Sequence, residues 1–203
     1  MSTRKKTHFA LLGLLSWKPM SGYDIKKIVD IGLSHFWNEN YGQIYPTLDA
    51  LVAERLATKS VDKSSGKRTR HLYSITPAGV KAFRQWLKQP TDPPITRNEL
   101  QLKLFLGSQL PKKTSLVMIE EYRVQQLSIL QEYRKSEAIL HQAIQTGLYS
   151  DEVEKILASE KPRRTRKAKA QQCSIFLLTL RHGILAIEAR IVWCGEVVSY
   201  LKV

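Results

Sequence analysis

The 203-residue chain is 43% hydrophobic and carries a formal net charge of +14, with a sequence pI of about 9.8. This composition excludes a disordered protein and suffices for one larger folded domain or two small ones. Residues 1–90 hold 15 Lys/Arg against 6 Asp/Glu, and residues 91–203 hold 17 against 12. This excess of positive charge favours a polyanion partner, either nucleic acid or an anionic membrane, over a merely basic soluble protein.

Two short helices are predicted at the start of the chain. The first covers residues 7–16 and ends before Pro19, because proline lacks the N–H that a helix interior needs. Ser21 is placed to cap the second helix, which runs to about Asp30. Both helices carry apolar side chains and are expected to share one core.

The third helix is the most informative element. Asn40 can serve as its N-cap, and Gln43 follows three residues later, which is the spacing of a capping box. Apolar residues then recur at i, i+4, i+7 and i+8, as in an amphipathic helix. These residues are Ile44, Leu48, Leu51 and Val52.

The outer face of this helix supplies candidate DNA contacts. With Leu48 at the centre of the buried face, a step of about 100° per residue places Gln43, Pro46, Thr47, Ala50 and Ala53 outside. Gln43 and Thr47 are the candidate base readers, because glutamine can bond adenine twice and threonine can contact a thymine methyl. A glutamine here is equally compatible with a pure capping role. The candidate phosphate contacts around the first turn are Asn40, Tyr41 and Tyr45.

A β-hairpin is predicted next. Two β-capable stretches, residues 57–61 and 71–75, flank a polar, basic tip that contains Gly66. A further helix then starts at Thr76 as N-cap, with Pro77 at its first position. The basic residues of the tip are candidate contacts to phosphates or the minor groove, although such a tip is often only a solvated turn. They are Lys67, Arg68 and Arg70.

A proline-rich connector divides the chain. Three prolines within five residues, Pro90, Pro93 and Pro94, cannot continue a helix and favour an extended linker. We therefore predict a DNA-binding domain over residues 1–89, a linker over 90–97 and a second domain over 98–203.

The second domain is predicted to be all helical and to form a homodimer. Its helices are expected over residues 99–107, about 112–146, a short stretch from 150, and about 170–201. The last helix is apolar nearly all round, so a partner chain is expected to cover what its own chain cannot. The predicted dimerisation residues are Leu116, Ile119, Leu127, Leu130, Ile175, Leu178, Ile184, Ile191, Trp193 and Val198.

The order of elements predicts a mainly α fold with a small β-hairpin wing, a winged helix-turn-helix followed by a helical dimerisation domain. A helix fits the major groove and can present side chains to base edges, while a basic hairpin beside it can hold the backbone. In a two-fold dimer, two such helices lie about one DNA turn apart.

Four segments carry a resemblance to a known family. They are Phe9–Leu15, Met20–Ile25 with Ser-Gly-Tyr-Asp, Gly42–Leu48 with Ile-Tyr-Pro, and Arg70–Gly79. Over about residues 7–89 the chain resembles the PadR family of bacterial transcriptional regulators, and its C-terminal half resembles the longer subfamily. One departure is the wing, Ser64–Arg70, where many relatives carry a Gly-Arg-Pro type of turn.

The resemblance implies a homodimer, usually a repressor, that binds double-stranded DNA at an imperfect inverted repeat. It also implies that a small aromatic effector could release the protein from DNA, as in some family members, from a pocket near the dimer interface. Two cysteines make no disulfide framework, so a reducing cytoplasm is the expected location.

The residue patterns do not predict catalysis. The five histidines show no metal-ligand spacing, and there is no glycine-rich phosphate loop, so no metal, cofactor or enzyme activity is expected. Cys173 and Cys194 would lie about 31 Å apart on one helix and cannot pair. The charges within residues 175–201 argue against a membrane span, and the N-terminus lacks a signal-peptide cleavage site.

Two alternatives remain open. Trp86, Trp193 and Tyr200 could line an aromatic ligand site, which would make the chain a sensor with secondary DNA binding, although packing is the more frequent use of such residues. The basic segment 161–169 could contact RNA or a membrane, or add to the field that steers DNA. If this segment contacts RNA, the protein would be a non-specific nucleic-acid binder.

Overall fold

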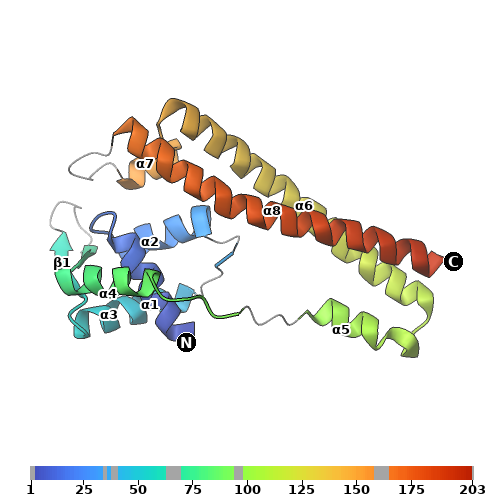
Figure 1. Ribbon diagram of the computed structural model, residues 1–203. Helices are drawn as coiled ribbons and strands as arrows, with labels where there is room; N and C mark the ends of the chain where they lie inside the picture. The colour runs from blue at the N-terminus through green and yellow to red at the C-terminus, as the bar shows by residue number, and fades with distance from the viewer. Residues whose placement is uncertain are drawn as a thin grey trace. The chain divides into compact units, whose positions relative to one another are not determined.

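A computed structural model describes residues 3–33, 36–37, 41–62, 70–93, 98–157 and 165–202. The predicted mainly helical fold with a hairpin after the N-terminal helices is confirmed (Figure 1). Its elements are α1 (Thr3–Leu15), α2 (Gly22–Ile28), η1 (Val29–Leu33), η2 (Tyr41–Gln43), α3 (Ile44–Ala53), β1 (Ala57–Asp62), β2 (Arg70–Ile75), α4 (Pro77–Leu87), α5 (Glu99–Phe105), η3 (Gly107–Gln109), α6 (Lys112–Thr146), α7 (Asp151–Leu157) and α8 (Arg166–Lys202).

The chain forms two compact units. The winged unit comprises Met1–Pro93 together with α7, and the helical unit comprises Pro94–Ser150 and Thr165–Val203. The short helix α7 therefore groups with the N-terminal elements, although it lies in the sequence between α6 and α8.

Local capping sets the helix starts of the winged unit. Ser21 caps α2 through a reciprocal capping box with Asp24, in which each backbone N–H donates to the other side chain at 3.1–3.2 Å. Thr76 caps α4 by accepting from the Gly79 N–H at 3.0 Å, with Pro77 at the first helical position. Both predicted caps are confirmed. The third helix, α3, starts only at Ile44 after the 3₁₀ turn η2, with Gln43 as its N-cap and no side-chain cap bond from Gln43. Asn40, the other half of the predicted capping box, lies outside the described residues.

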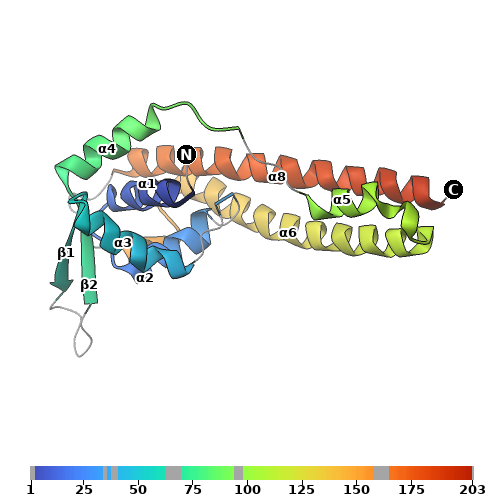
Figure 2. The ribbon, with the colours of Figure 1, turned by 90° about the horizontal axis from the view of Figure 1, so that it is seen from below.

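A small sheet joins the helices. The strands β1 and β2 pair antiparallel from Ala57 opposite Ile75 to Asp62 opposite Arg70 (Figure 2). Met20 extends the sheet by exchanging two backbone hydrogen bonds with Tyr73, at 3.0 and 2.8 Å. The buried core beneath is Leu11, Leu12, Leu14, Leu15, Met20, Ile25, Ile28, Val29, Ile44, Leu48, Leu51, Ala57 and Tyr73.

The turn after α3 lies directly against α4. Arg55 has a φ of 58°, and the Leu56 N–H returns to the Leu51 carbonyl at 2.9 Å, which is a left-handed helix ending. The Leu56 carbonyl then accepts from the Thr76 N–H at 3.0 Å. A Cβ on Gly79 would lie 2.2 Å from that carbonyl oxygen, so only glycine fits there.

Two long antiparallel helices, α6 and α8, run side by side in the helical unit (Figures 1 and 2). Their core contains Ile119, Cys194 and Val198, with Leu100 and Leu104 of α5 packed against it. Ile184 is also fully buried, at 0% exposure. The prediction that Ile119, Ile184 and Val198 bind a partner chain is therefore wrong, because α6 and α8 of one chain already cover them.

An ionic cluster links α6 and α8. Glu137, whose side chain is 12% exposed, pairs with Arg134 at 2.6 Å and with Arg181 at 3.2 Å. Arg134 also pairs with Glu188. The hydrogen bond from Arg134, followed by that from Arg181, lowers the pKa of Glu137 below its ordinary value.

Replacing Glu137 with glutamine is expected to lower the free energy of unfolding by about 1 kcal/mol at pH 7, because both arginines are partly exposed and solvent screens them. A carboxylate with a depressed folded pKa stabilises the fold above its unfolded pKa, and this contribution is lost as the pH falls through the folded value. The difference from wild type, measured in urea titrations, should therefore shrink as the pH falls below the ordinary glutamate pKa and through the folded value. Glu132→Gln, at a 65%-exposed side chain that pairs with Lys135 at 2.6 Å, is the control. An equal loss in both variants would contradict the role of the cluster.

Candidate nucleic-acid interface

The exposed face of α3 is rotated by about half a helical step from the predicted face. Ile44, Thr47, Leu48 and Leu51 are buried, whereas Gln43, Tyr45, Pro46 and Asp49 are exposed. Thr47 is only 3% exposed, so its predicted role as a base reader is wrong. The buried stripe is centred nearer Ile44 than Leu48, a rotation of about 50° at the helical step. Gln43 stays on the exposed side, at the N-terminal end of the helix.

Tyr45, in the first turn of α3, packs its ring against α2. Its side chain is 55% exposed, yet its ring packs over Gly22, where a Cβ would come within 2.5 Å of Tyr45 Cε1. The glycine of the Ser-Gly-Tyr-Asp motif thus leaves room for the Tyr45 ring. Tyr45 thus remains more than half exposed beside the first turn of α3, and its contact with phosphate remains a prediction.

Two residues of α2 were missed by the sequence analysis. Tyr23 is 59% exposed, and Lys27 Nζ lies 5.1 Å from the centroid of its ring. An exposed aromatic side chain with a lysine four residues later is the signal that could have identified them, because this spacing stacks the pair on one helix face. Tyr23 follows directly after Gly22, so the pair adds a hydroxyl and a cation to the helix on which the Tyr45 ring packs.

Arg70 has a structural partner. Its guanidinium donates to the Asp24 carboxylate and, at 3.3 Å, to Ser21 Oγ. Asp24 is largely buried, with a side chain 12% exposed, whereas the Arg70 side chain is 41% exposed. The pair ties the start of β2 to the first turn of α2. Arg70 therefore fixes the base of the wing, in addition to any contact that it makes with DNA.

The acidic residue of α3 is neutralised. Asp49 Oδ1 accepts from Lys59 Nζ at 3.1 Å and from the Tyr73 hydroxyl at 3.4 Å. The hydrogen bond to Asp49, and then that involving Tyr73, raises the pKa of Lys59 above its ordinary value. Lys59 thus stays charged, and the Asp49 carboxylate does not repel phosphate as a free charge would.

Several predicted contacts lie outside the described residues. These are Asn40 at the start of the third helix and Lys67 and Arg68 at the wing tip, as well as the side chain of Tyr41. Their roles remain predictions.

The two tryptophans predicted for an effector site lie in different units. In the winged unit, Trp86 stacks on Phe9 at 5.0 Å between ring centroids and lies 6.1 Å from Phe83. In the helical unit, Trp193 packs against the cluster of Ile119, Cys194 and Val198. Both are used in packing, and an effector role for either remains a prediction. Within the described residues no group of three or more His, Cys, Asp or Glu side chains could hold a metal ion.

Comparisons with known proteins agree with this geometry. Residues 11–85 match the transcriptional regulator PadR-like family, and residues 96–202 match the virulence activator alpha C-terminal family. The negative transcriptional regulator PadR of Bacillus subtilis is 33% identical over 107 residues, which are 52% of this chain and 58% of that protein. The chain thus spans little more than half the length of that relative.

Solved structures share the fold over nearly the whole chain. B. subtilis PadR in complex with operator DNA has a TM-score of 0.73 at 20% identity, and the same protein with p-coumaric acid has 0.68 at 21%; each covers 96% of this chain and 98% of its own. The Vibrio cholerae virulence activator AphA has a TM-score of 0.58 at 28% identity, with 96% and 97% covered. Across the part of the chain that the structure describes, none of the helices has the length and apolar character required to cross a membrane.

Proposed function

Because the chain belongs to the PadR-like family of transcriptional regulators and carries a virulence activator alpha C-terminal domain, we propose that it is a cytoplasmic repressor that binds an inverted-repeat operator as a homodimer. The observation that carries the proposal is the exposed N-terminal end of α3. Gln43 and Tyr45 are exposed there, and the Tyr45 ring packs over Gly22 of α2, whose first turn Arg70 ties to the base of the wing. Gln43 is the proposed base reader, and the tyrosines and lysines around it are proposed phosphate contacts.

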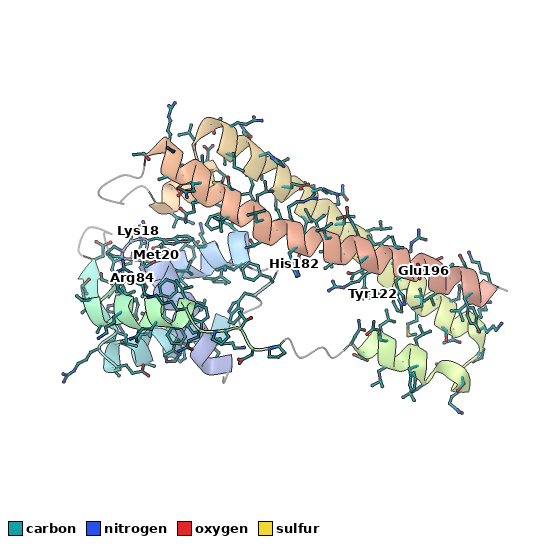
Figure 3. All side chains as sticks on the ribbon, in the orientation of Figure 1. Lys18, Met20, Arg84, Tyr122, His182 and Glu196 are labelled. Atoms are coloured by element: carbon teal, nitrogen blue, oxygen red, sulfur yellow. The ribbon has the colours of Figure 1, made fainter. Side chains whose placement is uncertain are left out.

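The homodimer is supported by a second apolar stripe on α8. Large apolar side chains on this stripe remain 55–66% exposed in the single chain: Ile175, Leu178, Leu185 and Val192. With His182, Ala189 and Glu196 they recur at alternating steps of three and four residues, which is the spacing of a coiled-coil seam. At about 100° per residue this stripe lies roughly opposite the one that packs on α6. Figure 3 labels two of its polar members, His182 and Glu196.

Other predicted dimer residues fit this arrangement to different degrees. Ile175 and Leu178 belong to the exposed stripe of α8, and Leu127 on α6 is 46% exposed. Leu116, Leu130, Ile191 and Trp193 are half-buried and can add to the edge of an interface. A partner chain is proposed to cover the stripe, since a soluble monomer rarely exposes so large an apolar surface.

The sign of regulation and an effector are proposed by analogy. The Bacillus relative is named a negative regulator and has been solved with p-coumaric acid, which supports repression and release by an aromatic molecule. A shallow apolar groove on α6 is lined by Leu116, Val117 and Val124 but also by Glu120 and Glu121. Those carboxylates would repel an acidic effector, so we assign the groove no effector role.

The proposal is tested by selecting binding sites from random genomic fragments at two salt concentrations and sequencing the retained DNA. An enriched inverted repeat supports the proposal. Binding without enrichment, and with a steep loss of affinity as salt rises, would favour a non-specific nucleic-acid binder. A reporter gene placed behind the enriched site separates a repressor from an activator.

Gln43→Ala is expected to weaken binding to the enriched site about tenfold and to relax its sequence preference, because one bidentate base contact is worth about 1–3 kcal/mol. Affinity for unrelated DNA should stay unchanged. Gln85→Ala, at an exposed position of α4, is the matched control. If fluorescence anisotropy gave both variants the wild-type affinity and preference, Gln43 would be no base reader.

A further inference from the structure

The short helix α7 is held at its C-terminal end by a buried lysine. Lys18 and Ile156 are each 9% exposed, and the Lys18 ammonium donates to the backbone carbonyl of Ile156. That carbonyl belongs to the last turn of α7 (Asp151–Leu157), whose carbonyl groups have no partner within the helix. A buried ammonium requires such an acceptor, so the contact joins α7 firmly to the winged unit.

The residues before α7 are fixed on the helical unit instead. Gly147 ends α6 with a φ of 65° and leaves no room for a Cβ, which would lie 2.7 Å from Arg166 Cβ at the start of α8. Tyr149 is 7% exposed, its hydroxyl donates to Gln172, and Lys169 Nζ lies 5.0 Å from its ring centroid. Only residues 150–155 separate this fixed point from Ile156. They form most of a helix about 10 Å long.

Lys18 lies next to the elements that read DNA. Two residues later, Met20 pairs with Tyr73 of β2, and three residues later Ser21 caps α2 and accepts from Arg70. Figure 3 labels Lys18 and Met20, both in the winged unit. Three residues of backbone therefore connect Lys18 to the base of the wing and to the first turn of α2.

We propose that α7 is a strap that couples the dimer-forming helices to the DNA-reading elements, and that Lys18 is the positioning residue that holds the strap. The inference rests on the proposed function, since it assumes that a dimer binds two half-sites. Two recognition helices must be held about one DNA turn apart. A strap that limits the motion of each winged unit reduces the ordering cost of binding both half-sites at once. Through the same strap, a shift at the start of α8 changes operator affinity.

The test compares Lys18→Met with Lys81→Met in the full-length protein. Methionine keeps the apolar stem of Lys18 but removes the donor, and Lys81 is an exposed lysine of α4, so its variant loses the same charge. In Lys18→Met, amide hydrogen exchange over residues 151–157 should quicken at least tenfold, and affinity for the full inverted repeat should fall about tenfold, within the range of measured couplings. Affinity for a single half-site and its salt dependence should match those of Lys81→Met.

A second variant releases the other end. Tyr149→Phe keeps the ring but removes the hydrogen bond to Gln172. Tyr149→Phe should lower the affinity for the full repeat as Lys18→Met does, and it tests the strap even if Lys18→Met fails to fold. If both variants fold, the double variant should bind the full repeat as tightly as either single variant. The strap would be overturned if amide exchange over residues 151–157 were unchanged in Lys18→Met. It would also be overturned if exchange were faster but Lys18→Met bound the full repeat as tightly as Lys81→Met. If wild type bound no repeat at all, the proposed function would fail, and the exchange data would still decide whether Lys18 holds α7.

Discussion

Gly79→Ala is expected to lower the free energy of unfolding of the winged unit by about 2–3 kcal/mol. The added Cβ would lie 2.2 Å from the Leu56 carbonyl oxygen and 2.9 Å from Ile75 Cγ1. The first of these neighbours is backbone, so α4 or the turn after α3 must move. That movement strains the bonds from Thr76 to the carbonyls of Leu56 and Arg55, at 3.0 and 2.8 Å. The higher helix propensity of alanine offsets at most about 1 kcal/mol of this loss in the free energy of unfolding.

Urea unfolding followed by tryptophan fluorescence measures this loss, because Trp86 reports on the winged unit. Gly32→Ala is the matched control, since no atom lies within 4 Å of a Cβ there. It should leave the unfolding midpoint close to that of wild type. If Gly79→Ala unfolded at the same urea concentration as Gly32→Ala, the close approach of α4 to Leu56 would not exist in solution.

Much of the fold could be predicted from residues that are close together in the sequence. Ser21 and Thr76 cap helices because the bonds that they accept come from residues three positions away, so the caps can be predicted without any knowledge of tertiary structure. The hairpin likewise follows from two short β-capable stretches around a polar tip. The family resemblance rested on the same local segments, and the comparisons confirm it.

The wrong predictions concern residues whose surroundings are set by contacts between segments far apart in the sequence. Thr47 is buried because the stripe that faces α1 and α2 is set by packing, and a rotation of half a step is beyond the resolution of a periodicity argument. Arg70 has a carboxylate partner 46 residues away. An apolar residue of α8 such as Ile184 can face either α6 or a second chain, and sequence alone does not distinguish the two.

The position of α7 shows the same limit. Its sequence predicts a short helix but says nothing of which unit it joins. The bond from Lys18 to Ile156 reveals the attachment. Tyr23 and Lys27 were missed for a different reason. Their spacing was visible in the sequence, but exposure of the aromatic ring was needed to separate a surface pair from a core residue.

Leu185→Glu is expected to abolish the proposed homodimer and, with it, the proposed high-affinity operator binding. Leu185 is 55% exposed near the middle of the free stripe of α8, and a two-fold interface would contain the substitution twice. Burying an unpaired carboxylate costs about 3–5 kcal/mol, which corresponds to a rise of at least about 100-fold in the dimer dissociation constant. Light scattering should then give a mass near 23.3 kDa. A monomer engages one half-site, so affinity for the full repeat should fall to that for a single half-site.

Thr179→Glu provides the control on the same helix. It introduces the same charge at an exposed position that lies about 100° from the centre of the stripe, so it should leave a dimer with full affinity for the repeat. The comparison separates the interface from the general effect of reduced positive charge on DNA binding, because both variants carry the same net charge. A dimeric Leu185→Glu would place the interface elsewhere on the helical unit, on α6 or on the exposed apolar face of α5 around Phe105.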